Sequence, residues 1–167
     1  GPPGEPGPVT IAGPVLARGH LDQALDAEAF VTGQDGVRRH VTRDLGEWDG
    51  ERLTVLGRVY DLIVTGGHKV APLAVEAVLG DVRGVGRVCV VGVPDEAWGR
   101  TVVAVVVPDG APPLLEDLRA AARTLGRAAA PHHLLLTDLL PERGPGKVDR
   151  AAVAAWATDR ITTRPRP

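Results

Sequence analysis

Residues 88–107 have the sequence VCVVGVPDEAWGRTVVAVVV, in which two runs of mostly β-branched residues flank a short polar loop. Val88–Val93 and Val102–Val107 contain few polar interruptions, a pattern typical of strands that are covered on both faces. Pro94-Asp95 opens the loop between them, and the loop runs through Trp98-Gly99. The stretch therefore predicts two central strands of a small sheet.

Helical patterns lie on both sides of this stretch. Pro72 is well placed at a helix start, and the following residues Val75, Val78 and Leu79 have the i, i+3, i+4 spacing of one buried helix face. After Pro112-Pro113, a second helix carries one apolar stripe. The stripe consists of Leu114, Leu118, Ala121, Ala122 and Leu125. Further expected elements are a strand at Asp61–Val64, a strand at Leu134–Leu136 and a helix at Ala151–Trp156. We expect a compact α+β domain over residues 58–160.

The first 57 residues differ from the rest of the chain in composition. Prolines and glycines are interleaved as far as Pro14, which excludes an early helix and leaves only short extended segments. We expect Val9–Ile11 and Val15–Ala17 to form two short strands or one bent strand. Further expected strands are Arg38–Leu45 and Arg52–Leu56, with weak helical character at Leu21–Phe30. Asp49-Gly50 is a good hairpin signal between the last two strands. We therefore expect a β-rich segment at 1–57, and a disordered tail at 161–167.

The composition argues against two classes of function, nucleic-acid binding and membrane insertion. The 19 Lys and Arg residues nearly balance the 21 Asp and Glu residues, so the formal charge is −2. A nucleic-acid or polybasic membrane surface would need a clustered positive excess, and no apolar run approaches the roughly 20 residues that span a bilayer. We expect neither nucleic-acid binding nor membrane insertion. The chain contains no Met, so we expect it to be a piece of a longer protein.

Common phosphate and metal motifs are not matched. Gly146-Lys147 lacks the rest of a Walker loop, because Pro141 stands where the first glycine is required and Val148 replaces Ser or Thr. Cys89 lies inside an apolar strand and is interpreted as a core residue. His132-His133 have no third ligand nearby, and we expect no metal site.

Short motifs that are ambiguous one at a time become informative through their order. They are Gly7–His20, Thr42-Arg43-Asp44-Leu45-Gly46, Gly57–Ile63, Gly66-Gly67-His68-Lys69-Val70, Val91–Gly99 and Pro141-x-x-x-x-Gly146-Lys147-Val148-x-Arg150. In this order they resemble the C-terminal core motifs of the adenylate-forming superfamily, the acyl-CoA synthetases and ligases. The resemblance covers nearly the whole chain. It implies the α+β mobile C-terminal domain of that superfamily, preceded by a β-rich remnant of the large N-terminal domain.

The resemblance also implies roles for single residues. Asp44 would accept both ribose hydroxyls of ATP, and Arg58 would supply donors near the same ribose and phosphate. Lys147 would place a positive charge between the substrate carboxylate and the α-phosphate, where negative charge develops. Gly66 and Gly67 would line the pantetheine path of CoA.

The chain departs from the family pattern at two positions. Arg43 stands where the family usually has glycine, so a bulky cation lies next to Asp44 in the sequence. Tyr60 stands where the family commonly has the Asp or Lys of its interdomain hinge, and Asp61 follows it directly. The hinge is therefore expected at Tyr60 or Asp61.

Other parts of the implied enzyme are expected upstream of this chain. In the family, the phosphate loop, the magnesium glutamate and the acid pocket all precede the segment that Gly7–His20 resembles. The implied cofactors are ATP, CoA and Mg²⁺, with the magnesium ligands upstream, and we expect no adenylate formation by this chain alone.

The implied function is that of a cytoplasmic acid–CoA ligase that forms acyl-AMP and then acyl-CoA. The motifs are most similar to the o-succinylbenzoate–CoA ligases of menaquinone synthesis. Alternatives are a fatty- or aryl-acid CoA ligase, a peptide-synthetase adenylation domain, and a stand-alone binding module without activity. A homo-oligomer is compatible with each of them.

Overall fold

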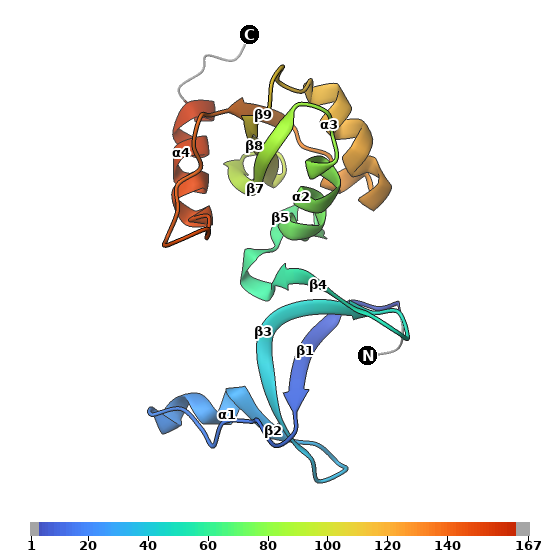
Figure 1. Cartoon of the computed structure of the whole chain (residues 1–167), viewed down its shortest axis with the longest axis vertical. Coiled ribbons are helices and arrows are strands. Elements are labelled where there is room, and N and C mark those ends of the chain that lie inside the picture. Colours follow the sequence, from blue (N-terminus) through green and yellow to red (C-terminus); the bar gives the residue numbers. More distant parts are fainter. Residues whose placement is uncertain (1–3, 163–167) are drawn as a thin grey trace. The chain divides into compact units, whose positions relative to one another are not determined.

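The computed structural model describes residues 4–162, and of Tyr60 only the backbone. The chain divides into two compact units, Gly1–Tyr60 and Asp61–Pro167 (Figure 1). The division falls slightly after the boundary expected at Gly57. Strand β4 (Leu53–Arg58) continues through Arg58, which pairs with Asp44, and a short 3₁₀ turn, η2 (Val59–Asp61), follows.

The first unit is built on an antiparallel sheet of four strands. Strand β3 (Arg38–Trp48) pairs with β1 (Gly7–Ala12), with β2 (Phe30–Thr32) and with β4. The predicted hairpin at Asp49-Gly50 is confirmed. Asp49 Oδ1 accepts from the backbone N–H groups of Glu51 and Arg52, at 2.8 and 2.7 Å, and Gly50 has a φ of +110°. The weak helical segment is present only as η1 (Gln23–Leu25) and the four-residue α1 (Asp26–Ala29).

The strand predicted at Val15–Ala17 is wrong. Gly13 has a φ of +124°, and the N–H of Leu16 donates to the carbonyl of Gly13 at 3.1 Å. The chain therefore turns directly after β1, so this segment cannot continue along β3.

The second unit is an α+β domain, as predicted. Its sheet consists of β7 (Val85–Asp95), β8 (Gly99–Pro108) and β9 (His133–Leu136) in that order, with β7 antiparallel and β9 parallel to β8. A separate hairpin is formed by β5 (Ile63–Thr65) and β6 (His68–Val70), and its return strand after Gly67 was not predicted. The helices are α2 (Pro72–Gly80), α3 (Leu115–Ala122) and α4 (Arg150–Thr162), and two 3₁₀ turns, η3 (Arg123–Leu125) and η4 (Arg127–Ala129), follow α3.

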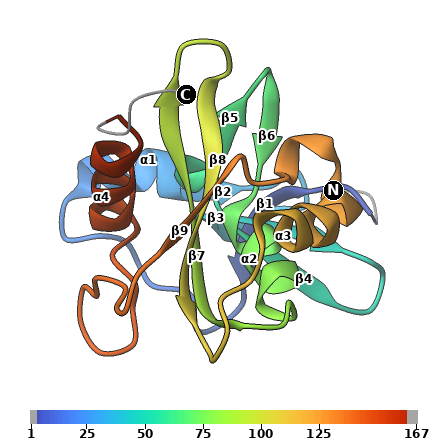
Figure 2. The same cartoon turned by 90° about the horizontal axis from the view of Figure 1, so that it is seen from above.

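Both faces of the three-stranded sheet are covered, as the unbroken apolar runs predict. Helices α2 and α3 lie on one face and α4 lies on the other (Figure 2). Alternate residues of β7 enter the two cores: Val90 packs with Leu79 and Leu118, whereas Val91 packs with Val153. Every buried apolar side chain of the described residues belongs to this unit.

The final helix is longer than expected. Val153, Ala157 and Ile161 are spaced by four residues along the side of α4 that packs against the sheet. The tail expected at 161–167 is therefore wrong for residues 161 and 162, which belong to α4, and residues 163–167 lie outside the described part of the chain. Within residues 4–162, no helix is long and apolar enough to cross a membrane.

Candidate functional site

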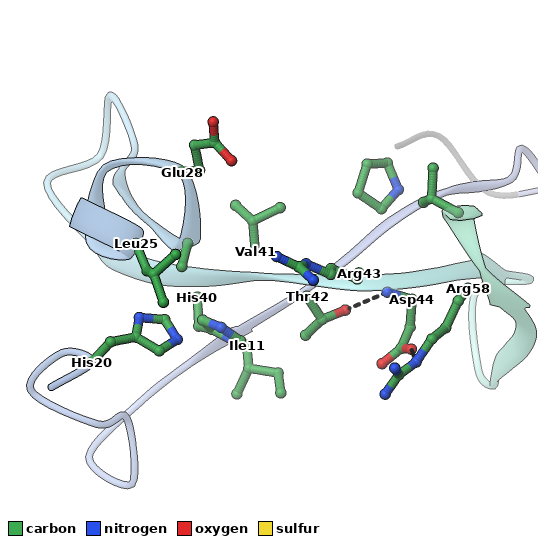
Figure 3. Close-up of a pocket in the computed structure, with 13 residues that line it drawn as sticks. Ile11, His20, Leu25, Glu28, His40, Val41, Thr42, Arg43, Asp44 and Arg58 are labelled. Carbon is green, nitrogen blue, oxygen red and sulfur yellow. Dashed lines mark hydrogen bonds and ion pairs between the residues drawn. The ribbon is translucent and has the colours of Figure 1, made fainter. Parts of the chain in front are cut away.

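Asp44 and Arg58 face each other at the end of the β3–β4 hairpin. They are register partners on the two strands, and Arg58 Nε lies 3.6 Å from Asp44 Oδ1 (Figure 3). The Asp44 side chain is 43% exposed and that of Arg58 is 68% exposed, so both remain accessible to a ligand. Two of the residues expected to bind nucleotide are thus brought together by strand pairing.

The backbone around this pair is specified by neighbouring residues. Thr42 Oγ1 donates to the carbonyl of Val9 at 2.8 Å and accepts from the N–H of Asp44 at 3.1 Å, which ties β3 to β1. Gly57, opposite Leu45, has a φ of +132°, and the register shifts between Leu45 and Gly46. Glycine at 57 is required because other residues rarely adopt that φ, and the irregularity turns the ends of both strands.

A cavity of about 680 Å³ in the first unit extends away from this pair. Its lining consists of Pro8, Ile11, His20, Leu25, Glu28, Ala29, His40, Val41, Thr42, Arg43, Asp44, Arg58 and Val59. Thr42 and Asp44 project to one side of β3, and Arg43 lies on the other side, as alternation along a strand requires (Figure 3). The arginine that departs from the family pattern therefore does not lie between Asp44 and Arg58.

The histidines of this cavity were not predicted from the sequence. His20 Nδ1 lies 2.9 Å from Asp26 Oδ1, and the ring of Phe30 packs against those of His20 and His40, with centroids 5.6 and 5.0 Å apart. Hydrogen bonds from the backbone and side chain of His20 lower the pKa of Asp26. These side chains come together only when β2 pairs with β3, and no local pattern indicates it.

Gly66 and Gly67 form the turn of the β5–β6 hairpin in the second unit. Their φ values of +52° and +80° are those of a tight two-residue hairpin turn. Gly66 donates to the carbonyl of Trp98 at 3.0 Å, and a Cβ built at Gly66 would lie 2.6 Å from the Trp98 ring. A Cβ at Gly67 would meet open space. The close approach at Gly66 is therefore to Trp98, whereas Gly67 faces outward.

Lys147 is exposed in the loop between β9 and α4. The loop is closed by an antiparallel bridge between Glu142 and Val148, and the N–H of Arg143 donates to the carbonyl of Lys147 at 2.8 Å. The hydrogen bond from Arg87, assisted by the backbone of Gly146, lowers the pKa of Glu142. Lys147 thus belongs to the second unit, and Asp44 and Arg58 to the first.

The expected hinge residues lie where the two units join along the chain. Tyr60 ends the first unit and Asp61 begins the second, and both belong to η2. Among residues 4–162, no group of three or more His, Cys, Asp or Glu side chains is arranged to hold a metal ion.

A half-buried ion pair in the second unit was not predicted. Glu76 of α2 contacts Arg150, the first residue of α4, through both carboxylate oxygens. Burial lowers the pKa of Arg150, and the hydrogen bonds to Glu76 raise it. The net shift of this pKa is upward. Cys89 lies beside this pair, and burial raises the pKa of its thiol to about 12, which agrees with a core role.

Comparison with known proteins identifies relatives over most of the chain. Residues 74–147 match the AMP-binding enzyme C-terminal domain. A probable 2-succinylbenzoate–CoA ligase of Mycobacterium tuberculosis is 44% identical over 153 residues, which cover 88% of this chain and 39% of that protein. The medium/long-chain-fatty-acid–CoA ligase FadD8 of the same organism is 38% identical over 162 residues, covering 91% of this chain and 28% of FadD8. The chain therefore spans well under half of the length of these relatives.

Solved structures show the same fold. The amide bond synthetase McbA of Marinactinospora thermotolerans superimposes with a TM-score of 0.82 at 32% identity, over 93% of this chain and 31% of McbA. The o-succinylbenzoate CoA synthetase MenE of Bacillus subtilis, solved with the acyl-adenylate OSB-AMP, gives 0.75 at 30% identity, over 90% and 31% of the two chains. The chain belongs to the adenylate-forming superfamily, and its residues 74–147 are an AMP-binding enzyme C-terminal domain.

Proposed function

We propose that this chain is the C-terminal part of an AMP-forming acid–CoA ligase. In the first half-reaction, the substrate carboxylate attacks the α-phosphorus of ATP and pyrophosphate leaves. In the second, the sulfur of CoA attacks the acyl carbon of the acyl-adenylate and AMP leaves. The first unit is the end of the large N-terminal domain, and the second is the small C-terminal domain.

The placement of Asp44 opposite Arg58 carries this proposal. A carboxylate and a guanidinium 3.6 Å apart at the edge of an open cavity offer an acceptor for the ribose hydroxyls and donors for the phosphate. Both groups are more than two-fifths exposed, so binding need not break a buried pair. Relatives that align with this region are CoA ligases.

Lys147 and Gly66-Gly67 serve the two half-reactions from the second unit. Lys147 presents a compact charge to the developing negative charge at the α-phosphate. Gly67, at an open hairpin tip, leaves room for the pantetheine of CoA along Gly66-Gly67. A rotation at Tyr60 or Asp61, where the units join, brings each face to the reaction in turn.

The substrate acid that we propose is o-succinylbenzoate, which places the enzyme in menaquinone synthesis in the cytoplasm. The support is the 44% identity to a probable 2-succinylbenzoate–CoA ligase, against 38% to a fatty-acid–CoA ligase. A fatty acid is the second candidate because of the latter match. Mg²⁺ would accompany ATP, held by residues upstream of this chain.

The test is acid-dependent release of pyrophosphate by the full-length enzyme that carries this chain. The acids compared are o-succinylbenzoate, a medium-chain fatty acid and a cinnamic-type aryl acid, each with ATP and CoA. We expect release with o-succinylbenzoate, and acyl-CoA formed in equal amount. If only the fatty acid supports pyrophosphate release, the substrate is a fatty acid and not o-succinylbenzoate. If no acid supports release, the proposed ligase function is wrong.

A further inference from the structure

The loop that carries Lys147 is closed on itself. The N–H of Asp149 donates to the carbonyl of Pro141 at 2.7 Å, and the N–H of Lys147 donates to the carbonyl of Gly144 at 3.2 Å. These short-range bonds define the shape of the loop at residues 141–149. They do not define where the loop lies on the domain, which has to come from contacts with other elements.

Arg150, at the end of the loop, supplies such contacts. Its Nη1 contacts Glu76 Oε1 and donates to the carbonyl of Val90 at 2.6 Å, and its Nη2 donates to Glu76 Oε2 at 3.1 Å. Glu76 Oε1 also accepts from the N–H of Val90 at 2.6 Å. One guanidinium thus joins the start of α4 to α2 and to the middle of β7.

Burial distinguishes this pair from the Arg87–Glu142 ion pair, which also joins the loop to β7. The side chains of Arg150 and Glu76 are 24% and 14% exposed. At the other end of the loop, Arg87 and Glu142 lie 2.8 Å apart but are 43% and 34% exposed, and pairs of that kind hold a structure weakly. The Arg150–Glu76 pair is therefore less screened by water than the Arg87–Glu142 pair, and its two-pronged contact imposes a specific geometry.

We propose that the Arg150–Glu76 pair positions Lys147 for adenylate formation. The proposal rests on the role given to Lys147 in the proposed function. Arg150 is only three positions after Lys147, a span of at most about 10 Å, so a shift at Arg150 is passed directly to the lysine. The planar fork of arginine fits both carboxylate oxygens and the Val90 carbonyl, which the single ammonium of lysine cannot do. Arg150 is a positioning residue, because it acts through Lys147.

The first test measures the loop in the 167-residue chain by amide hydrogen exchange. Arg150→Ala should accelerate exchange at Arg143 and Asp149 by roughly tenfold or more, because the loop loses its anchor. The matched control is Arg119→Ala, which removes another half-buried arginine that holds two carbonyls, of Pro131 and His132, away from this loop. Unchanged exchange in the loop, or the same uniform acceleration in both variants, would overturn the proposal.

The second test separates the half-reactions in the full-length enzyme. Arg150→Ala should slow adenylate formation by about 10- to 100-fold, the cost of a misplaced catalytic group, and leave thioester formation from supplied acyl-adenylate near normal. Glu76→Gln, which removes the charge and keeps the shape, should slow the same step less. Equal loss in both half-reactions would instead indicate a general folding defect and contradict a positioning role.

The double variant Lys147→Ala/Arg150→Ala gives the sharpest outcome. It should be no slower in adenylate formation than Lys147→Ala alone, because Arg150 has nothing left to position. Multiplied losses would show that Arg150 acts independently and overturn the proposal. If Lys147→Ala by itself leaves adenylate formation normal, the proposed role of the lysine fails, and the amide exchange still decides whether the pair holds the loop.

Discussion

The two units of the chain differ in where their apolar side chains lie. In the second unit, both faces of the β7–β8–β9 sheet are covered by helices, and Leu79, Val90 and Leu118 are fully buried. In the first unit, the only buried positions among residues 4–59 are Gly46 and Gly57. The second unit therefore has a hydrophobic core of its own. The first unit has no such core among residues 4–59, and its sheet holds Asp44 and Arg58.

The unit that has the stable core is therefore not the unit that carries the proposed nucleotide-binding pair. A three-stranded sheet between helices can fold by itself, because its apolar area is removed from water on both sides. The apolar side chains of the first unit, such as Ile11 at 46% and Val55 at 53% exposure, remain in water. Under the proposed function, the rest of the large domain would cover them.

The largest expected effect is on the stability of the second unit. Leu118→Ala removes a fully buried side chain between α3 and the sheet, and should lower the free energy of unfolding by about 2–5 kcal/mol. The matched control is Leu53→Ala in β4, where the side chain is 45% exposed, and the loss should be under about 1 kcal/mol. Urea unfolding followed by circular dichroism measures both. Equal losses of unfolding free energy in the two variants would contradict the difference in core packing between the units.

The next largest effect is on catalysis from the second unit. Lys147→Ala in the full-length enzyme should slow adenylate formation by roughly 10²–10³, the range for losing one preorganised charge. Thioester formation from supplied acyl-adenylate should stay near normal, because the proposed rotation moves the lysine away. Single-turnover assays of each half-reaction test this, with Lys69→Ala as a control lysine on β6. A parallel decline of both half-reactions, with an unchanged melting temperature, would contradict the assignment.

A smaller effect is expected from the first unit. Asp44→Ala should weaken ATP binding by the full-length enzyme about 10- to 100-fold, because a charge-assisted pair of hydrogen bonds contributes about 1.5–3 kcal/mol. Glu47→Ala serves as the control, since this carboxylate lies on the same strand but does not line the cavity. Calorimetric titration with ATP gives both dissociation constants. Equal affinities in the two variants would contradict the nucleotide-binding role of Asp44.

The smallest effect concerns the β5–β6 hairpin. Gly66→Ala should destabilise the second unit by about 1–2 kcal/mol from the left-handed backbone, with an added cost from the Trp98 ring. Gly67→Ala has a similar φ and open space around it, so its loss should be limited to the backbone strain. In a Trp98→Ala background, the two glycine variants should become alike in urea unfolding. If the two glycine variants still differ in the Trp98→Ala background, the Trp98 ring is not the reason that glycine is required at position 66.

Signals that are local in the chain were sufficient for much of the fold. The β-branched runs predicted β7 and β8 and their double coverage, Asp49-Gly50 predicted the β3–β4 hairpin, and Pro72 predicted the start of α2. Each of these depends on neighbours within a few residues, through side-chain alternation, turn conformation or a fixed φ. The ordered motifs likewise indicated the superfamily without any knowledge of contacts.

Contacts between distant residues decided the rest. Val15–Ala17 has strand-like residues, yet the turn at Gly13 directs it away from β3. Glu76 and Arg150 are 74 positions apart, and Gly66 owes its tight surroundings to Trp98 on another hairpin. The sequence by itself determined the central strands β7 and β8, the β3–β4 hairpin, the start of α2 and the motifs that indicate the superfamily. Only the tertiary structure decided which charges pair, because pairing depends on three-dimensional distance, which one-dimensional spacing does not encode.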